Sequence, residues 1–286
     1  MKLDPSCRIL IVGLGLLGGS YAMALKKQGY AVSAITLNQQ DIDYAMEHHL
    51  IDRGSTSVDA DLIADANLIV FALYPHVFVD WVGRYGHLIR AGTTVTDVTG
   101  VKGGMVDEIQ RLLPPDVEFI AAHPMAGREV SGVQNSSDAI FHGANYIVVP
   151  TERNTPTAID LCRRLGETLG FASVSELTPE KHDAMIAFLS QLTHGIAVSL
   201  MCANDDPDLV QYTGDSFRDL TRIADINDTM WSELFLANRS ALLKEMDAYR
   251  RTFDQLYTHI QNGDRESIRA MMRLSTSRRR QFNKKV

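Results

Sequence analysis

A short glycine-rich segment near the start of the chain constrains the fold more than any other feature. The apolar run Ile9–Val12 predicts a strand, and it leads directly into Gly13, Gly15 and Gly18 at G-x-G-x-x-G spacing. The following residues predict a helix that runs to about Lys27. The first glycine permits the tight turn, the second lets the backbone approach a pyrophosphate, and the third lets the helix pack closely on the strand. The segment therefore predicts dinucleotide binding, with the phosphates at the amino end of the helix.

Other residues near this loop are candidates for contact with the nucleotide. Leu16 and Leu17 begin the predicted helix, and Leu73 ends a later apolar strand. Thr36 stands about 20 residues beyond the glycines, where Asp or Glu would bond the ribose hydroxyl of NAD. No Arg or Lys follows Thr36 within five residues to pair with the 2′-phosphate of NADP. We expect NAD as cofactor, with NADP as the alternative.

The first 180 residues alternate short apolar runs with helical stretches, which is typical of βαβ units. We therefore predict an α/β fold, with a Rossmann-type, doubly wound, mainly parallel sheet over residues 1–180. The predicted strands are Ile9–Val12, Ala31–Ile35, Leu68–Leu73, Thr93–Thr96, Phe119–Ala122, Tyr146–Val149 and Ala172–Val174. From Lys181 onward the periodicity is helical, so residues 181–286 are predicted to form an all-helical domain for substrate binding and dimerisation.

Two long helices are expected in this second half. Ala184–Leu200 is apolar on nearly every face, as in a helix buried all round. Ser232–Ile260 is amphipathic, with apolar residues near helical spacing. A small helical domain that contains a helix apolar all round often completes its core through a partner chain, so we expect a homodimer.

Composition excludes several classes of partner. The net charge of −7 gives no basic field for nucleic acid or an anionic membrane, and we expect the basic run Arg278–Lys285 to be a solvated tail. Cys7, Cys162 and Cys202 are widely spaced, which fits reduced thiols and offers no metal site. The amino terminus has no signal-peptide layout, and no apolar stretch reaches the roughly 18 residues of a membrane span. We expect a soluble, cytoplasmic protein.

Four polar residues are candidates for the chemistry. His123 follows a predicted strand, at the sheet edge where α/β enzymes keep their sites, although a structural hydrogen bond would explain it equally well. Ser190 and His194 lie four apart in the apolar helix and should share one face, for catalysis or for core hydrogen bonding. Arg222 sits among apolar neighbours, and a buried guanidinium usually meets a carboxylate of the protein or of a ligand.

These segments occur together in a specific order along the whole chain. They are Gly13–Ser20, Thr96–Lys102, His123–Gly127, Ser190–His194 and Phe217–Arg222, followed by Met230 and Trp231. In this combination the chain resembles the prephenate and arogenate dehydrogenases of tyrosine biosynthesis. The ordered set is far more specific than any single motif.

The resemblance implies a hydride transfer coupled to decarboxylation of a ring. His123 matches the catalytic histidine, which accepts a hydrogen bond from the ring hydroxyl and must be neutral to do so. Arg222 matches the anchor of the side-chain carboxylate, and Ser190 and His194 match positions of the active-site pocket. Prephenate and arogenate both remain open as substrates.

Further positions follow from the same resemblance. Asp183 and Trp231 match supporting positions, where Asp183 would orient His194 and Trp231 would shape the pocket. Arg128 could meet a second substrate carboxylate, or it could face solvent or pair with Glu129.

One position departs from the pattern of the relatives. Many relatives carry a serine where this chain has Gly100, and that serine would contact both the catalytic histidine and the cofactor. Either Thr99 substitutes for it or the contact is missing, so both residues are candidates at the cofactor site.

Two rival functions remain. A β-hydroxyacid dehydrogenase would share the two-part layout, but it would want a catalytic lysine in the helical half, where Lys181 is poorly placed. A catalytically inert NAD(H) sensor would keep the glycine loop without needing His123, Ser190, His194 and Arg222 together.

Overall fold

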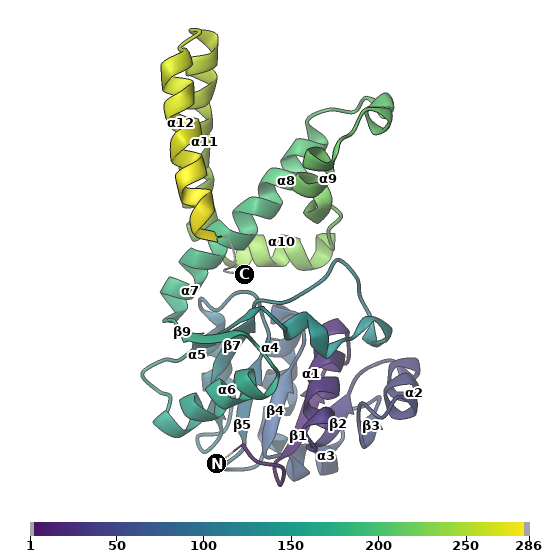
Figure 1. Ribbon diagram of the computed structural model, residues 1–286. Coiled ribbons are helices and arrows are strands. Elements are labelled where there is room, and N and C mark those ends of the chain that lie inside the picture. The colour runs from purple at the N-terminus through teal and green to yellow at the C-terminus, as the bar shows by residue number, and fades with distance from the viewer. Residues whose placement is uncertain (1–2, 283–286) are drawn as a thin grey trace. The chain divides into compact units, whose positions relative to one another are not determined.

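The computed structural model describes residues 3–282, and the chain divides into two compact units, residues 1–238 and 239–286 (Figure 1). The first unit holds two sheets and the helices around them. The second unit consists of two helices. Lys284 and Lys285 of the predicted basic tail lie outside the described residues.

The main sheet has six parallel strands in the order β3-β2-β1-β4-β5-β6. The strands are β1 (Arg8–Val12), β2 (Ala31–Ile35), β3 (Arg53–Ser55), β4 (Leu68–Phe71), β5 (Thr94–Asp97) and β6 (Glu118–Phe119). Val12 pairs with Ile35 on one side and with Phe71 on the other, so three strands end level at the edge where the glycine loop begins. This order is that of a dinucleotide-binding Rossmann sheet, and the predicted fold class is confirmed.

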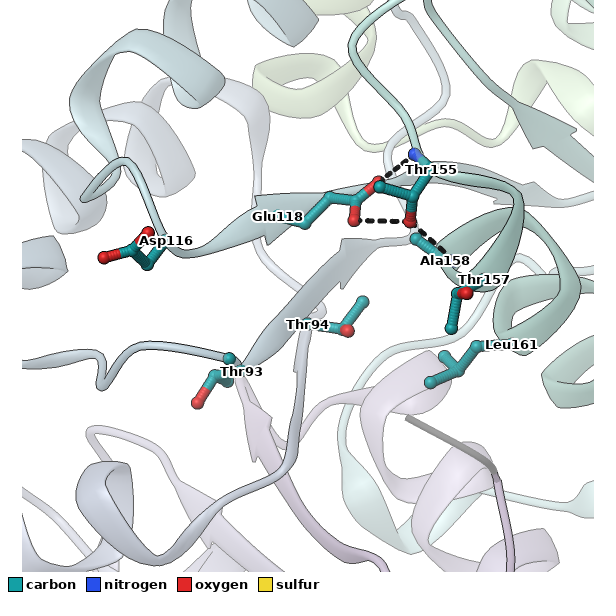
Figure 2. Close-up of a pocket in the computed structure, with 9 residues that line it drawn as sticks. Thr93, Thr94, Asp116, Glu118, Thr155, Thr157, Ala158 and Leu161 are labelled. Carbon is teal, nitrogen blue, oxygen red and sulfur yellow. Dashed lines mark hydrogen bonds between the residues drawn. The ribbon is translucent and has the colours of Figure 1, made fainter.

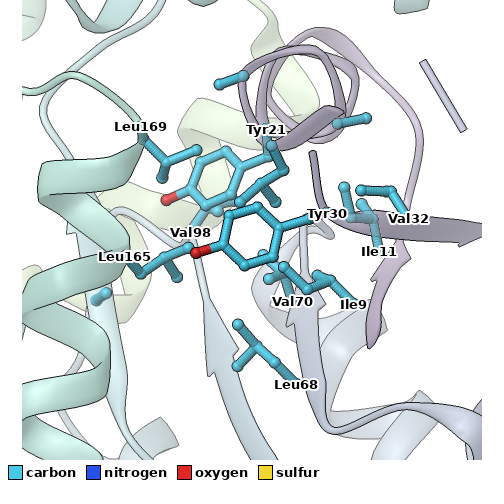
Figure 3. Packing of buried hydrophobic residues seen from close by; sticks show 14 of the residues in the cluster. Ile9, Ile11, Tyr21, Tyr30, Val32, Leu68, Val70, Val98, Leu165 and Leu169 are labelled. Carbon is cyan, nitrogen blue, oxygen red and sulfur yellow. The ribbon is translucent and has the colours of Figure 1, made fainter. Parts of the chain in front are cut away.

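Helices cover both faces of this sheet. One face carries α1 (Leu16–Lys27), α2 (Gln39–Glu47) and α6 (Pro156–Thr168), and the other carries α3 (Ala60–Asp65), α4 (Pro75–Tyr85) and α5 (Met105–Leu112). Ile9 belongs to the first core, which also contains Tyr21, Tyr30 and Leu165 (Figure 3), and Leu10 belongs to the second. Because successive strand residues point to opposite faces, a strand covered on both faces is continuously apolar.

A smaller sheet follows the main one. It contains β7 (Ala121–Pro124), β8 (Asn145–Val149) and β9 (Ser173–Glu176), with β7–β8 antiparallel and β8–β9 parallel. The single predicted strand Phe119–Ala122 is therefore wrong, because the chain leaves the main sheet at Ile120. Phe119 still pairs with Val95 of β5, whereas Ala122 pairs with Val148 of β8.

The apolar helix of the second half runs through a change of geometry. It comprises α7 (Pro179–Ile186), a π turn over Ala187–Leu192 and α8 (Thr193–Cys202). Thr178 caps its start by accepting a hydrogen bond from the backbone N–H of Lys181. The prediction that this helix is buried all round is wrong for the single chain, because the Phe188 residue is 54% exposed.

The same helix bears on the membrane prediction. Pro179–Cys202 has a mean hydropathy of 1.5 over an 18-residue window of which 28% is buried, so by length and composition it could cross a membrane. The prediction that no stretch is long and apolar enough was therefore wrong. One such helix is weak support for a membrane location, because an apolar helix of a soluble protein passes the same test.

The remaining helices are shorter or lie in the second unit. They are α9 (Asp215–Thr221), α10 (Asp228–Ala237), α11 (Arg239–Gln261) and α12 (Arg265–Arg279). Single 3₁₀ turns cover Gly86–Leu88, Val133–Asn135, Asp138–Phe141, Pro207–Gln211, Arg222–Ala224 and Arg280–Phe282. The predicted helix Ser232–Ile260 is in fact two helices, because Asn238 leaves the helical conformation with φ −110° and ψ 26°.

Candidate active site

The glycine loop after β1 is shaped by close backbone packing. Gly13 has φ +96°, and a Cβ there would lie 2.4 Å from the carbonyl oxygen of Ala72 and 2.8 Å from Leu73 Cδ2. A Cβ on Gly18 would lie 1.9 Å from the carbonyl oxygen of Gly13. No side chain fits at either position. A Cβ on Gly15 would meet nothing within 4 Å, so the space above this residue is open.

The start of α1 suits a dinucleotide. Gly15 is the N-cap residue of α1, and no side chain accepts a hydrogen bond from the first N–H groups of the helix. Leu16 and Leu17 begin the first turn, which contains no acidic residue. Unpaired N–H groups and the positive end of the helix dipole both favour a phosphate. The chain therefore fits NAD at this loop, with Gly13, Gly15 and Gly18 making room for the pyrophosphate.

Thr36 lies directly after β2, at the same edge of the sheet. Its backbone N–H donates to the carbonyl oxygen of Ser55, which fixes the strand end. The side chain of Asn38 is already engaged, because it accepts a hydrogen bond from the N–H of Gln40 and caps α2. This edge offers a hydroxyl but no carboxylate to the ribose.

His123 lies on β7 and belongs to a chain of three side chains. Its Nδ1 is 2.8 Å from Nε2 of His182, and Nδ1 of His182 is 2.7 Å from Oδ1 of Asp183. Asp183 also accepts hydrogen bonds from the backbone N–H groups of Lys102, at 2.9 Å, and Gly103, at 2.6 Å. The α7 helix is thereby joined to the loop after β5 and to the strand that carries His123.

Burial keeps these imidazoles neutral. It lowers the pKa of His123 well below its usual 6.5, and the neighbouring His182 and the charge of Lys102 also oppose a proton on His123. Burial also lowers the pKa of His182, although the hydrogen bond to Asp183 opposes this shift. His123 is therefore available as a hydrogen-bond acceptor at neutral pH.

A buried ion pair supports the backbone beside His123. Lys102 is fully buried, and its Nζ donates to Asp97 Oδ2 at 2.6 Å and to the carbonyl oxygen of Ala122 at 2.7 Å. Asp97 Oδ1 accepts a hydrogen bond from the N–H of Ala122 at 3.0 Å. Both backbone groups of the residue before His123 are thus held by this pair.

Thr99 is occupied within the buried ion pair. It is buried, and its Oγ1 donates to Asp97 Oδ2 and accepts a hydrogen bond from Lys102 Nζ. Gly100 lies beside His123, since a Cβ there would be 3.9 Å from His123 Cε1 and 3.6 Å from Leu234 Cδ2. The contact from a hydroxyl at position 100 is therefore missing.

The helical half supplies a second histidine. The ring of His194 stacks on Trp231 at 3.7 Å, and its Nδ1 lies 2.9 Å from the backbone carbonyl oxygen of Ser190. That carbonyl belongs to the π turn and also accepts a hydrogen bond from the hydroxyl of Thr193 at 2.6 Å. Burial lowers the pKa of His194, so this ring also presents a neutral Nε2.

Arg222 is exposed rather than buried, which corrects the prediction. Its side chain is 63% exposed, and Nη1 pairs with Glu129 Oε1 at 2.5 Å. The expectation that it meets a carboxylate holds, with Glu129 as the partner. Arg128 is exposed, and Glu129 pairs with Arg222.

Asp183 differs most from its predicted role. It bonds His182 and two backbone N–H groups, and no hydrogen bond joins it to His194 in the described residues. Sequence reasoning missed His182, and it gave no role to Asp97 and Lys102, although both lie in the segment Thr96–Lys102. The available signal was the adjacent His–Asp pair at the start of an apolar helix, because two polar residues entering a core need partners.

A separate cavity of about 160 Å³ lies at the other edge of the main sheet (Figure 2). Its lining residues are Gly92, Thr93, Thr94, Asp116, Glu118, Thr155, Thr157, Ala158 and Leu161. The carboxylate of Glu118 accepts hydrogen bonds from the N–H and the hydroxyl of Thr155, at 2.6 and 2.8 Å. Glu118 thus holds Thr155, the N-cap residue of α6, and the lining of this cavity includes none of the predicted site residues.

Comparison with known proteins identifies the two halves. Residues 21–175 match the family model of the prephenate dehydrogenase nucleotide-binding domain, and residues 178–274 match that of the prephenate dehydrogenase dimerization domain. The chain is 29% identical to the prephenate dehydrogenase of Bacillus subtilis over 267 residues, which cover 91% of this chain and 72% of that one.

Solved structures agree. Prephenate dehydrogenase from Aquifex aeolicus, in complex with hydroxyphenyl propionate and NAD+, superimposes with a TM-score of 0.90 at 28% identity, covering 99% of this chain and 100% of that one. Arogenate dehydrogenase from Synechocystis gives a TM-score of 0.82 at 26% identity, with 96% and 100% covered.

Proposed function

The chain belongs to the prephenate dehydrogenase family, and we propose that it oxidises prephenate with NAD, releasing the ring carboxylate as carbon dioxide to give 4-hydroxyphenylpyruvate. Bound NAD supplies the hydride acceptor. The glycine loop and the uncapped start of α1 fit its pyrophosphate, and Leu73, Thr36 and Gly100 lie on the loops around it. No cationic residue follows Thr36 within five positions, which favours NAD over NADP.

The observation that carries the proposal is the state of His123. Its Nδ1 forms a hydrogen bond with His182, and burial keeps the imidazole neutral. Nε2 is therefore left as a hydrogen-bond acceptor. We infer that this nitrogen accepts the hydrogen bond of the ring hydroxyl and takes its proton as the carbon–oxygen bond gains double-bond character. Loss of the carboxylate then makes the ring aromatic, which drives the reaction forward.

The helical half holds the substrate in this proposal. Arg222 binds the side-chain carboxylate, for which it must exchange its pairing with Glu129. His194, stacked on Trp231, and Ser190 form the wall of the pocket. We retain Arg128 as a candidate for a second carboxylate, because it is exposed while Glu129 is engaged elsewhere.

The test is turnover in four mixtures: prephenate or arogenate, each with NAD or NADP. Reduced nicotinamide is followed by absorbance. We expect turnover with prephenate and NAD. Faster turnover of arogenate would reassign the substrate, and detectable NAD binding without turnover in any mixture would favour the inert sensor.

We also propose a homodimer formed through the helical domain. The residues Met185, Phe188 and Leu189 on the apolar helix are each about half exposed, so burying the remaining surface contributes about 1 kcal/mol each, roughly half the value for full burial. Light scattering should give about twice the 31.7 kDa chain mass. A monomeric mass would contradict the proposal.

Two further assignments follow from the same reasoning. The functional boundary lies near residue 180, so that residues 1–180 bind the dinucleotide and residues 181–286 bind substrate and the second chain. An enzyme that uses NAD and a biosynthetic intermediate is expected in the cytoplasm. Fractionation of cells that express the chain tests this location.

A further inference from the structure

His182 is a fully buried histidine that lies directly behind His123. Its ring contacts His123 through Nε2 at 2.8 Å and Asp183 through Nδ1 at 2.7 Å, and the two imidazole rings meet edge to face at 5.1 Å. Neither the nucleotide loop nor the pocket wall includes it. Both ring nitrogens of His182 nevertheless form hydrogen bonds.

The direction of these hydrogen bonds follows from Asp183. An ionised carboxylate only accepts hydrogen bonds, so His182 Nδ1 must carry the proton that joins the two residues. Two backbone N–H groups, of Lys102 and Gly103, hold the carboxylate in place from the other side. Because a neutral imidazole carries one proton, His182 Nε2 is left as an acceptor.

His123 must then be the donor in the second bond. Its Nδ1 carries the proton that meets His182 Nε2, and its own Nε2 is left without a proton. The tautomer of His123 is therefore set through two successive hydrogen bonds, by the carboxylate of Asp183, which does not itself contact the substrate.

We propose that His182 is a positioning residue that fixes His123 in the Nδ1–H tautomer, so that Nε2 accepts the hydrogen bond of the substrate hydroxyl. This inference rests on the proposed function of His123. In the other tautomer, Nε2 of His123 would carry a proton. It could then not accept the proton of the substrate hydroxyl.

Burial and the charge of Lys102 keep the two imidazoles neutral, against the opposing effect of the Asp183 and Asp97 carboxylates on His182. Lys102 and Asp97 face the pair from the β5 side, and Asp183 faces it from α7. Lys102 Nζ is tied to Asp97 at 2.6 Å and to the carbonyl oxygen of Ala122, so it donates to neither imidazole. Its positive charge and the burial of both rings oppose protonation, so the neutral donor–acceptor order is kept near pH 7.

The first test reads the tautomer directly. Nitrogen-15 NMR of protein labelled at histidine separates protonated from unprotonated ring nitrogens, and His123→Gln assigns the His123 signals. We expect a protonated Nδ1 and a bare Nε2 in the wild-type protein. A protonated Nε2 would overturn the proposal. His194 is the internal reference, because its Nδ1 donates to a backbone carbonyl and should not respond to changes at position 182.

Two substitutions separate hydrogen bonding from packing. His182→Gln can still accept from His123 through its amide oxygen, so we expect the tautomer to be kept and kcat to fall less than about 10-fold. His182→Phe keeps the bulk but accepts nothing, so we expect a mixed tautomer and a kcat about 10²–10⁴-fold lower, with KM for prephenate nearly unchanged. His48→Gln, at the exposed C-cap residue of α2, is the control and should leave kcat unchanged.

These outcomes test the positioning role of His182 separately from the proposed function. Full kcat in His182→Phe, or an equal loss in both variants with the tautomer kept, would overturn the positioning role. If His182→Phe does not fold, His182→Gln and the wild-type tautomer still decide. A wild-type protein that never turns over prephenate would refute the proposed function, while the NMR result would still settle the tautomer.

Discussion

Replacing Lys102 by methionine should destabilise the protein far more than removing an exposed lysine. Lys102 is fully buried and donates to Asp97, to Thr99 and to the carbonyl oxygen of Ala122, at 2.6, 3.1 and 2.7 Å. Lys102→Met leaves a buried carboxylate without its counter-charge, which typically costs 3–5 kcal/mol. Asp97 keeps N–H donors from Thr99 and Ala122, so we expect a loss of about 3 kcal/mol, at the lower end of that range.

The matched control is Lys26→Met. Lys26 Nζ also lies 2.6 Å from a carboxylate, that of Asp52, but the two side chains are 25% and 46% exposed. Exposed pairs of this kind contribute about 0–1 kcal/mol. Urea unfolding, followed by fluorescence of Trp81 and Trp231, gives both values. Equal losses in the two variants would refute the reasoning.

A double variant and kinetics extend this test. Asp97→Leu combined with Lys102→Met removes both charges and should recover part of the lost stability. Since the pair holds both backbone groups of Ala122, next to His123, Lys102→Met should also lower kcat. Small misplacements of catalytic groups can cost about 10²-fold. Unchanged kcat in a folded Lys102→Met enzyme would show that the pair does not position His123.

Four further predictions concern the residues of the site. His123→Asn should lower kcat by roughly 10²–10⁴-fold with NAD affinity unchanged, as measured by calorimetry. Arg222→Ala should raise KM for prephenate about 10-fold, corresponding to about 1.4 kcal/mol, and an unchanged KM would place the anchor elsewhere. Because the pKa of His123 is lowered below 6.5, kcat/KM should stay level through pH 6.5 and fall only at lower pH; a fall centred above pH 6.5 would contradict this assignment. The free energy of unfolding should also decrease below pH 6.5, where the unfolded histidines bind protons that the buried ones do not.

The glycine loop and the doubly wound sheet could be predicted from the sequence, because both depend on the properties of neighbouring residues. The glycine loop could be read from the sequence because each glycine answers a local steric demand, seen in the 1.9 Å approach that a Cβ on Gly18 would make to the carbonyl oxygen of Gly13. The doubly wound sheet followed from continuously apolar strands such as Ile9–Val12, which only a sheet covered on both faces explains.

Features decided by distant partners were not predictable in the same way. Arg222 was expected to be buried because its sequence neighbours are apolar, yet tertiary packing leaves it exposed beside Glu129, 93 residues away. Asp183 was assigned to His194 on the resemblance to the prephenate and arogenate dehydrogenases. The loop at Lys102 and Gly103 instead fixes its carboxylate towards His182.

The break in the predicted strand Phe119–Ala122 has the same origin. Its residues are uniformly apolar, so the sequence does not mark the point at which the chain changes sheet. The change comes at Ile120, between β6 and β7, and the N–H of Ala122 then bonds the side chain of Asp97, a contact between residues 25 positions apart. Likewise, the exposure of Phe188 depends on what covers the helix, which a single chain's periodicity does not reveal.

The most direct test of the proposed reaction is its stoichiometry. Prephenate labelled with carbon-13 in the ring carboxylate is mixed with the enzyme and NAD, and labelled carbon dioxide is measured together with reduced nicotinamide. We predict one labelled carbon dioxide for each reduced nicotinamide, with 4-hydroxyphenylpyruvate as the product. Reduced nicotinamide without labelled carbon dioxide would contradict oxidative decarboxylation and indicate simple oxidation of a hydroxyl group.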